Sequence, residues 1–345
     1  MNLIYDNLIY SLQQAGGIST YWAELSARLI RDEIDVKFIE SENINIVRKE
    51  LNIPNKNILQ DRSLPLIINR FLSLPLPKIH NSFIFHSSYN RISGNKNAIQ
   101  VMTIHDFVHE KFYSGLRQKL HTYQKNMALK NAQLILAVSE NTKRDLLEYH
   151  PEINEADIKV IYNGVSEDFQ MFSDKTEVPL PYLLFIGSRE HYKNFTFVVN
   201  LLKELPGFHL YIVGRPFTEA ESSQLSVLKG RFKLFNNIDN IKLNELYNNA
   251  YALLYPSSYE GFGIPLLEAM KCGLPFIALN KSSIPEVAGK SGVLLEALDI
   301  DLFRDAVQFI DLNRNILVNK GLEQAKQFSW EKCYQQTVSV YQNLI

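Results

Sequence analysis

The amino-acid sequence predicts an α/β protein made of two doubly wound, Rossmann-like domains. Short apolar runs alternate with amphipathic stretches along the whole chain, a pattern typical of βαβ units with parallel sheets. The pattern restarts after residues 164–181, which contain Gly164, Pro179 and Pro181 without clear periodicity, and we interpret this stretch as an interdomain linker. A length of 345 residues also fits two domains of ordinary size.

We therefore expect an N-terminal domain at 1–165 and a C-terminal domain at 166–345, with a last helix at about 330–345 that could pack back on the N-terminal domain. The apolar runs predict strands at Leu3–Tyr5, Val36–Ile39, Phe83–Phe85, Ile99–Ile104, Leu134–Val138, Ile158–Tyr162, Tyr182–Ile186, Leu210–Val213, Phe232–Phe235, Tyr251–Tyr255, Phe276–Leu279 and Gly292–Leu295. The amphipathic stretches predict helices at Ile18–Ile30, Tyr113–Lys130, Asn141–Tyr149, Asn194–Glu204, Leu243–Asn249 and Pro265–Lys271, with more after Asp299.

Composition excludes several classes of protein. The 36 Lys and Arg residues balance 37 Asp and Glu residues, which argues against a protein built to bind nucleic acid. Cys272 and Cys333 are the only cysteines, too few for a disulfide framework or a thiolate zinc site. No apolar run reaches the ~20 residues that a membrane-spanning helix needs, and the first residues do not resemble a secretory signal. These features predict a cytoplasmic protein, with peripheral attachment to the inner face of the plasma membrane as an open alternative.

The segment with the clearest chemical content runs from Tyr259 to Met270. A glycine-rich loop containing Gly261, Phe262 and Gly263 follows a predicted strand and leads into a helix, so its backbone N–H groups can approach an anion. Glu260 lies on the loop and Glu268 lies in the helix, and the two carboxylates can accept hydrogen bonds from two sets of hydroxyls. The alternative is an ordinary helix start with a solvated Glu268.

Glu260 and Glu268 are separated by seven residues, and further motifs occur in a fixed order around them. These are Gly16-Gly17-Ile18-Ser19, Thr103-Ile104-His105-Asp106, Val138-Ser139-Glu140-Asn141-Thr142, Tyr162-Asn163-Gly164-Val165, Phe185-Ile186-Gly187-Ser188-Arg189, Tyr192-Lys193-Asn194-Phe195 and Ser283-Ile284-Pro285-Glu286-Val287. In this order and spacing, the chain resembles the family 4 retaining glycosyltransferases of the GT-B fold (glycosyltransferase group 1). It is most similar in pattern to the bacterial enzymes of that family that transfer mannose in O-antigen and surface-polysaccharide synthesis.

The resemblance implies a role for the cations that follow Gly187. Arg189 and Lys193 match the positions at which the family clamps the donor diphosphate, so we expect them to offset the charge of the leaving group. Without the resemblance, a solvated basic loop would be the simpler interpretation. The Glu190-His191-Tyr192 segment between them departs from the commoner form of the motif.

Other candidate residues follow predicted strands. Gly16 and Gly17 would present backbone N–H groups to the donor phosphate or the acceptor, or else form a plain tight turn. The resemblance implies that His105 contacts the donor sugar, with Asp106 as its neighbour; a structural histidine is the alternative. Ile238 lies in a loop that the family places near the nucleotide base. We expect Asp299 to cap a helix rather than to bind a metal.

His109 and Glu110 follow His105 closely enough to suggest a metal site, but a strand end followed by a loop does not place all these side chains on one face. We expect no metal and no cofactor, with Glu260, Arg189, Lys193 and His105 as the catalytic set.

One segment suggests a membrane contact. Residues 111–144 contain seven Lys and Arg residues against Glu140 alone, and Leu116, Leu120, Tyr123 and Met127 recur at helical spacing. Such a helix can dock on an anionic membrane surface, or it can pack on a core with a solvated basic face. The apolar segment Leu64–Pro77 is a second candidate for lipid or acceptor contact.

Taken together, the sequence predicts a retaining, metal-independent glycosyltransferase. Its donor would be a nucleotide sugar, with GDP-mannose favoured, and its acceptor a glycan or a polyprenyl-diphosphate-linked oligosaccharide; no nucleic acid is expected as a partner. The alternatives are a UDP-sugar-dependent enzyme of the same fold and a non-catalytic two-domain sugar-binding protein.

Overall fold

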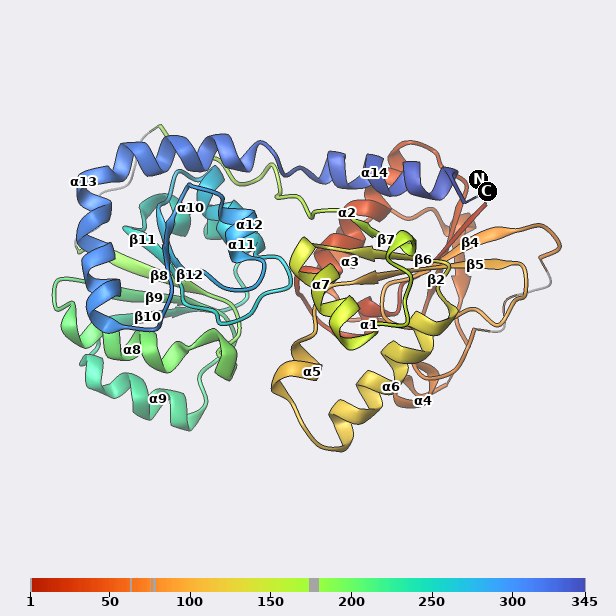
Figure 1. Ribbon diagram of the computed structural model, residues 1–345, viewed down its shortest axis with the longest axis horizontal. Coiled ribbons are helices and arrows are strands. Elements are labelled where there is room, and N and C mark those ends of the chain that lie inside the picture. Colours follow the sequence, from red (N-terminus) through yellow and green to blue (C-terminus); the bar gives the residue numbers. More distant parts are fainter. Residues whose placement is uncertain (1, 63, 75, 77–78, 174–179, 345) are drawn as a thin grey trace. The chain divides into compact units, whose positions relative to one another are not determined.

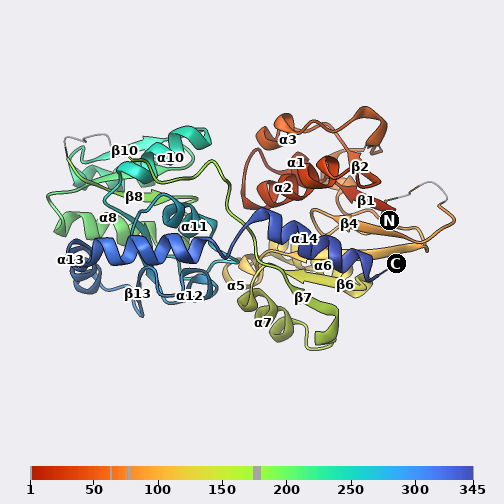
Figure 2. The same cartoon turned by 90° about the horizontal axis from the view of Figure 1, so that it is seen from above.

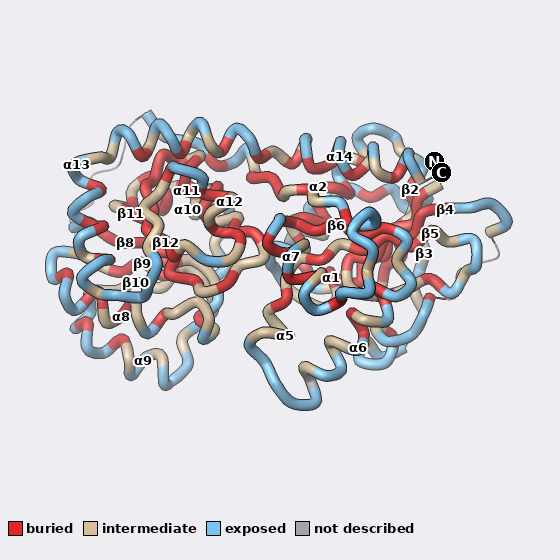
Figure 3. Tube along the Cα trace, viewed as in Figure 1, coloured by how far each residue is buried: buried red, intermediate tan, exposed pale blue. Residues whose placement is uncertain are grey.

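The computed structural model describes residues 2–62, 64–74, 76, 79–173 and 180–344, and it divides into two compact units (Figure 1). Unit 1 comprises Met1–Gly164 together with Trp330–Ile345, and unit 2 comprises Val165–Ser329. Each unit contains one parallel sheet flanked by helices. Figure 3 shows that most residues of the sheet strands are buried, whereas buried and exposed residues alternate along the helices.

The sheet of unit 1 has seven parallel strands in the order β3-β2-β1-β4-β5-β6-β7. The strands are β1 (Leu3–Asp6), β2 (Val36–Glu40), β3 (Ile58–Gln60), β4 (Phe83–Ser87), β5 (Ala98–Ile104), β6 (Leu134–Ala137) and β7 (Ile158–Val160). The strand order reverses between β1 and β4. In doubly wound sheets ligands bind beyond the carboxyl ends of the strands near such a reversal.

The helices of unit 1 are α1 (Ile9–Leu12), α2 (Gly17–Arg31), α3 (Ile46–Glu50), α4 (Leu66–Asn69), α5 (Val108–Phe112), α6 (Leu116–Asn131), α7 (Glu140–Tyr149) and α14 (Trp330–Gln342). The last helix comes from the far end of the chain and packs along α2 (Figure 2). Its Tyr341 is fully buried, and the Tyr341 hydroxyl lies 2.7 Å from the Tyr5 hydroxyl of β1. Residues from both ends of the chain therefore build the core of unit 1.

The sheet of unit 2 has six parallel strands in the order β10-β9-β8-β11-β12-β13, which reverses between β8 and β11. The strands are β8 (Tyr182–Ile186), β9 (His209–Val213), β10 (Phe232–Phe235), β11 (Ala252–Tyr255), β12 (Phe276–Leu279) and β13 (Val293–Leu295). The helices are α8 (Phe195–Glu204), α9 (Glu219–Leu225), α10 (Asn240–Asn249), α11 (Ile264–Lys271), α12 (Ile284–Ala288) and α13 (Ile300–Ala325). The Asp299 side chain accepts a hydrogen bond of 3.0 Å from the Leu302 N–H, so the predicted helix cap is confirmed.

Every strand and helix that the periodicity predicts is present, with boundaries that shift by a few residues. Sequence reasoning missed β3 and the short helices α1, α3, α4, α5, α9 and α12, because three to seven residues carry too little periodicity. His109 and Glu110, which we expected in a loop, lie in α5. The stretch interpreted as a linker needs correction, since its first part packs on unit 2. Phe169 is buried against Tyr247, and the Asn248 side chain bonds the backbone of Gln170 and Phe172. Residues 174–179 of that stretch lie outside the described part of the chain.

Across the ranges that the structure describes, no helix is both long enough and apolar enough to span a bilayer.

Candidate functional site

The candidate site of unit 2 lies where the strand order reverses, on the loops that follow β8 and β11. Lys193 follows β8, Glu260 follows β11, and Lys193 Nζ lies 2.5 Å from Glu260 Oε1. The two side chains are only 13% and 12% exposed, so the pair is partly withdrawn from water. Sequence reasoning placed both residues in the site, and the structure brings them into direct contact.

Asn194 joins these two loops. Its backbone adopts the left-handed conformation with φ of 55°, which Asn tolerates better than most residues. Its side-chain amide donates to the Pro256 carbonyl and the Ser258 hydroxyl, at 2.8 Å each. The Ser258 N–H in turn donates to the Tyr192 carbonyl at 2.8 Å. These bonds fix the distance between the loop that carries Lys193 and the loop that carries Glu260.

Two serines that follow β12 hold the backbone of the Glu260 loop. The Ser282 hydroxyl accepts a hydrogen bond of 2.8 Å from the Glu260 N–H. The buried Ser283 hydroxyl lies 2.9 Å from the Glu260 carbonyl and 2.8 Å from the Phe262 carbonyl, to which it donates. Sequence reasoning missed this role, although Ser283 opens one of the quoted motifs, because the bonds join segments more than twenty residues apart.

Glu268 lies in the second turn of α11, which begins after Gly263. Gly263 has φ of 113°, a conformation that favours glycine, and Pro265 occupies the first turn, where no N–H is needed. The Tyr247 hydroxyl of α10 donates to Glu268 Oε2 at 2.6 Å. Burial raises the pKa of Glu268 to about 7, and the Tyr247 hydrogen bond only partly opposes this shift. The side chain is therefore not the solvated glutamate of the alternative interpretation.

Arg189 lies in the interior of unit 2. The resemblance implied that it clamps the donor diphosphate, with a solvated basic loop as the alternative, and the structure rules out the solvated loop because the side chain is 0% exposed. Its Nε lies 3.0 Å from Glu221 Oε1 of α9, and its Nη2 donates to the carbonyls of Arg215 and Pro216. Although burial opposes it, hydrogen bonding to Arg189 and Thr218 lowers the pKa of Glu221 to about 2. Arg189 thus stabilises the loops after β8 and β9 from inside unit 2.

Two other predicted positions lie in loops near the edges of this arrangement. Gly187 follows β8 and approaches Gly214 so closely that a Cβ on Gly214 would lie 2.7 Å from the Gly187 carbonyl oxygen. Ile238 follows the edge strand β10, and Asp239 caps the helix after it by accepting from the Lys242 N–H at 2.8 Å. Because β10 is separated from β11 by two strands, the structure does not bring Ile238 into contact with Lys193 or Glu260.

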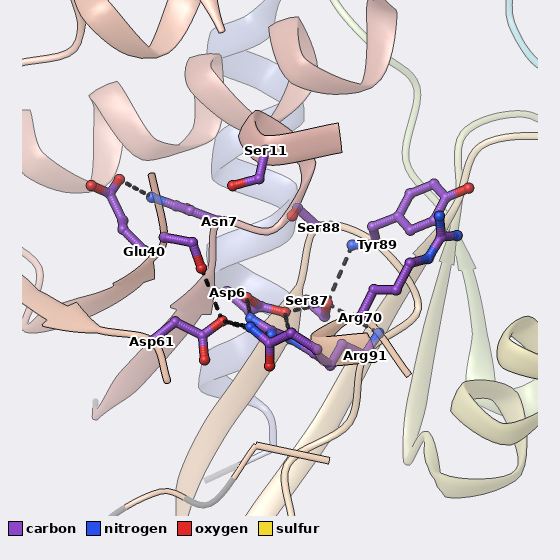
Figure 4. A network of polar contacts seen from close by, with 12 residues as sticks. Asp6, Asn7, Ser11, Glu40, Asp61, Arg70, Ser87, Ser88, Tyr89 and Arg91 are labelled. Carbon is purple, nitrogen blue, oxygen red and sulfur yellow. Dashed lines mark hydrogen bonds and ion pairs between the residues drawn. The ribbon is translucent and has the colours of Figure 1, made fainter. Parts of the chain in front are cut away.

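In unit 1, buried charges fill the space where the strand order reverses (Figure 4). Arg91 Nε donates to Asp6 at 2.9 Å, and Arg91 Nη1 donates to Asp61 at 2.7 Å. All three side chains are buried, and Ser87 donates a further hydrogen bond to Asp6. Buried carboxylates that are saturated in this way hold the ends of β1 and β4 together, so we assign this network to the architecture of the sheet.

The predicted residues of unit 1 meet in a hollow after β4 and β5. Ile18 from the start of α2 lines it, together with Ser88, Asn90 and His105. The ring of His105 lies 5.0 Å from the ring of Tyr21, which is also in α2. Gly16 precedes α2 and Gly17 is its first residue, next to Ile18 but not among the residues that line the hollow. Burial lowers the pKa of His105 well below the usual histidine value, so the imidazole is neutral at pH 7.

The residues after His105 have structural partners. The Asp106 carboxylate accepts a hydrogen bond of 3.0 Å from the Val108 N–H at the start of α5. Asp106, the neighbour of His105, therefore helps to begin this helix. Glu110 forms an ion pair of 2.9 Å with Lys125. Among the residues that the structure describes, no three His, Cys, Asp or Glu side chains lie close enough to hold a metal ion.

Residues 111–144, which include helix α6, are less basic than their sequence suggests. Lys125 is nearly buried in its pair with Glu110, Lys111 pairs with Asp145 at 2.8 Å, and Lys143 pairs with Glu155 at 2.7 Å. These carboxylates lie just outside residues 111–144, so a count over that window overlooked them; the side chain of Arg117 lies outside the description. The apolar residues of α6 do face solvent, with Leu116 74% and Tyr123 63% exposed. The core-packed alternative is therefore wrong for this face.

Two doubly wound, Rossmann-like domains, each with one parallel sheet, are the architecture of the GT-B class. Comparison with known proteins agrees. Residues 166–328 match the family described as "Glycosyl transferases group 1", and residues 15–169 match "Glycosyltransferase Family 4". The chain belongs to this family of glycosyltransferases.

Several relatives support this assignment. The chain is 30% identical to O-antigen chain mannosyltransferase B of Escherichia coli over 291 residues. The aligned region covers 77% of this chain and 75% of that protein. It is 29% identical over 243 residues to O-antigen chain mannosyltransferase RfbU of Salmonella typhimurium, covering 68% of this chain and 67% of that protein.

Solved structures share the fold at lower identity. A sucrose-phosphate synthase from Thermosynechococcus elongatus superposes with a TM-score of 0.78 at 18% identity, over 100% of this chain and 99% of that chain. HepE from Anabaena, solved in complex with UDP-glucose, superposes with a TM-score of 0.76 at 15% identity, over 99% of this chain and all of that chain.

Proposed function

We propose that this glycosyltransferase moves a hexose from a nucleotide sugar to a glycan or to a polyprenyl-diphosphate-linked oligosaccharide, with retention of anomeric configuration and without a metal ion. The observation that carries the proposal is the pair of Lys193 and Glu260 beyond β8 and β11, with Glu268 on the helix that follows. The Lys193 cation suits a diphosphate, the Glu260 carboxylate suits sugar hydroxyls once it leaves Lys193, and the half-buried Glu268 carboxylate suits a ribose.

In this proposal Lys193 offsets the charge that develops on the departing diphosphate, and the start of α11 at Gly263 supports it. Glu260 exchanges its contact with Lys193 for the hydroxyls of the donor sugar. Glu268 accepts hydrogen bonds from the ribose, and neutral His105 contacts the sugar that is transferred. Arg189 acts as a positioning residue, since its guanidinium is committed to Glu221.

GDP-mannose is the favoured donor because the relatives quoted above are mannosyltransferases of O-antigen synthesis. A UDP-sugar is the second candidate, because HepE shares the fold and was solved with UDP-glucose. A non-catalytic sugar-binding protein would need none of the charged groups that the loops after β8 and β11 hold together.

Release of nucleoside diphosphate from a panel of nucleotide sugars tests the reaction class. We expect slow release from one donor, with GDP-mannose first, and an anomeric configuration in the product that matches the donor when it is read by NMR. Inverted product would contradict retention, and no release from any donor would contradict the enzyme assignment.

Binding of the free nucleoside diphosphate to Glu268→Ala tests the ribose contact. Losing a hydrogen bond to a charged group costs about 1.5–3 kcal/mol, so calorimetry should show an affinity that is lower by about tenfold to 100-fold. Unchanged affinity would contradict the role given to Glu268. Glu323→Ala is the matched control, since Glu323 is an exposed glutamate of the same unit.

A further inference from the structure

Unit 1 contains two hollows that share one residue. The first is the polar hollow that contains His105, Ser88 and Asn90. The second lies between the segment after α4 and helix α6, and it is lined by Phe71, Leu72, Tyr123, Met127, Arg70 and Asn90. Asn90 lies at the boundary of the two, in the left-handed conformation with φ of 52°. A ligand that passes Asn90 would therefore occupy both hollows.

The second hollow has the character of a site for hydrocarbon. Phe71 and Leu72 on one side and Tyr123 and Met127 on the other are all at least 38% exposed. Exposed apolar residues continue beyond it along α4 and α6, at Ile67, Ile68, Leu116 and Leu120. Single exposed apolar residues are common on protein surfaces, but clusters of this kind mark contacts with partners or ligands.

A cation without an acidic partner lies between the apolar hollow and the polar one. The Arg70 guanidinium lies 5.1 Å from the centre of the Phe71 ring. It lies 5.3 Å from the centre of the Tyr89 ring, beside which Figure 4 shows it. Within the described part of the chain, the Arg70 side chain donates one hydrogen bond, to Gln124 Oε1 at 3.3 Å, and its buried Nε has no hydrogen-bond partner there. Among the described residues no carboxylate pairs with Arg70, whereas Arg91 and Lys125 nearby are both paired.

The order of these groups matches an amphiphile with an anionic junction. Hydrocarbon would lie against Tyr123 and Met127, a phosphate or diphosphate would lie at Arg70, and a polar end group would reach the hollow that contains His105. Guanidinium groups suit phosphate because they offer several N–H donors in one plane. An apolar ligand alone would leave Arg70 without an anion, and a free sugar would leave the apolar hollow exposed.

We propose that this composite groove binds the lipid diphosphate portion of the acceptor, with the prenyl chain between Phe71 and Tyr123 and the diphosphate at Arg70. The proposal rests on the proposed function for the identity of the group carried beyond the diphosphate. The binding of the lipid diphosphate itself is independent of the proposed function. Arg70 then determines specificity for an acceptor that carries phosphate.

Binding of three probes tests the groove without any transfer reaction. Farnesyl diphosphate, farnesol and inorganic diphosphate are titrated by calorimetry at concentrations below micelle formation. We expect farnesyl diphosphate to bind at least about tenfold more tightly than either part alone. Arg70→Gln should weaken its binding about tenfold, the scale of one lost hydrogen bond to a charged group, and Arg70→Lys should restore part of it.

Two further variants separate the groove from general effects. The double variant Tyr123→Ser, Met127→Ser should weaken farnesyl diphosphate and leave inorganic diphosphate unchanged. Lys119→Gln, an exposed cation on the same helix, and Leu312→Ser, an exposed leucine of unit 2, should change neither. Equal affinity of wild type and Arg70→Gln for farnesyl diphosphate would overturn the proposal.

A bilayer contact is the competing explanation, and vesicles of phosphatidylglycerol distinguish it. We expect Arg70→Gln to bind these vesicles as wild type does. If Arg70→Gln loses vesicle binding in the same proportion as farnesyl diphosphate binding, the surface is a membrane contact and the proposal is wrong. With an active donor, Arg70→Gln should raise KM about tenfold for a sugar on a prenyl diphosphate and leave KM unchanged for the same sugar as a methyl glycoside.

Discussion

Lys193 and Glu260 neutralise each other in the absence of a ligand. Their contact of 2.5 Å is partly shielded from water, so each side chain is held in one place before a donor arrives. In the proposed mechanism, a diphosphate that approaches Lys193 competes with Glu260 and frees the carboxylate for sugar hydroxyls. One ion pair can thus prepare both halves of donor recognition.

Arg189 should affect stability more than catalysis. Arg189→Ala removes the partner of a shielded carboxylate and leaves Glu221 without its guanidinium, and breaking a buried pair in this way costs about 3–5 kcal/mol. We expect a lower free energy of unfolding in urea and, for the folded fraction, a single-turnover rate within a few-fold of wild type. A stable Arg189→Ala with a rate about 10²-fold lower would return Arg189 to the catalytic set.

Glu268 should make stability depend on pH in a defined direction. Its folded pKa, about 7, lies above the ordinary glutamate value of 4.5, so the folded state binds a proton that the unfolded state has released between those values. The stabilising contribution is present below pH 4.5 and is lost as pH rises to 7, by at most about 3 kcal/mol. Glu268→Gln has no such loss.

We therefore expect urea unfolding to show that Glu268→Gln gains stability over wild type at pH 8 relative to pH 5. The control Glu323→Gln should show no pH-dependent difference, because Glu323 is exposed. A difference between Glu268→Gln and wild type that is equal at both pH values would mean that the carboxylate ionises normally in the folded protein.

At the scale of elements, the start of α12 positions the Glu260 loop. Ser283→Ala removes the hydroxyl that bonds the Glu260 and Phe262 carbonyls and leaves buried acceptors without a donor, at a cost of about 1–3 kcal/mol. We expect a higher KM for the donor together with a modest loss of stability. Ser283→Thr keeps the hydroxyl and should recover most of the donor affinity, whereas equal KM for Ser283→Ala and wild type would limit Ser283 to a structural role.

For helix α6, the sequence predicts the helical spacing and the apolar face but not the net charge of its surface. Its helical spacing and its exposed apolar face agree with the structure, since both depend on residues within the helix. Its charge does not, because Glu110 lies outside the helix and neutralises Lys125. The second predicted lipid or acceptor contact, Leu64–Pro77, is described only in part, because residues 75 and 77 lie outside the described part of the chain.

At the scale of the whole molecule, local periodicity predicted all strands of both sheets except β3, because the central strands are short, buried apolar runs. The order of motifs identified the family, and Lys193, Glu260 and His105 lie after strands, as predicted, while their roles stay predictions. Sequence could not show that Arg189 turns inward, because its partner Glu221 is 32 residues away. It also could not show that Ser283 holds the Glu260 loop, since that contact depends on how β12 lies beside β11.

The central claim is that Lys193, and no divalent metal, offsets the charge of the leaving diphosphate. The most direct test is single-turnover transfer from the active donor, with and without EDTA, for wild type, Lys193→Ala and the control Lys203→Ala on α8. We predict that EDTA leaves the wild-type rate unchanged. Lys193→Ala should lower the rate by roughly 10²-fold with a smaller change in donor affinity, because the charge grows as the bond breaks. A wild-type rate abolished by EDTA and restored by Mg²⁺ or Mn²⁺, or a Lys193→Ala rate equal to wild type, would contradict the claim.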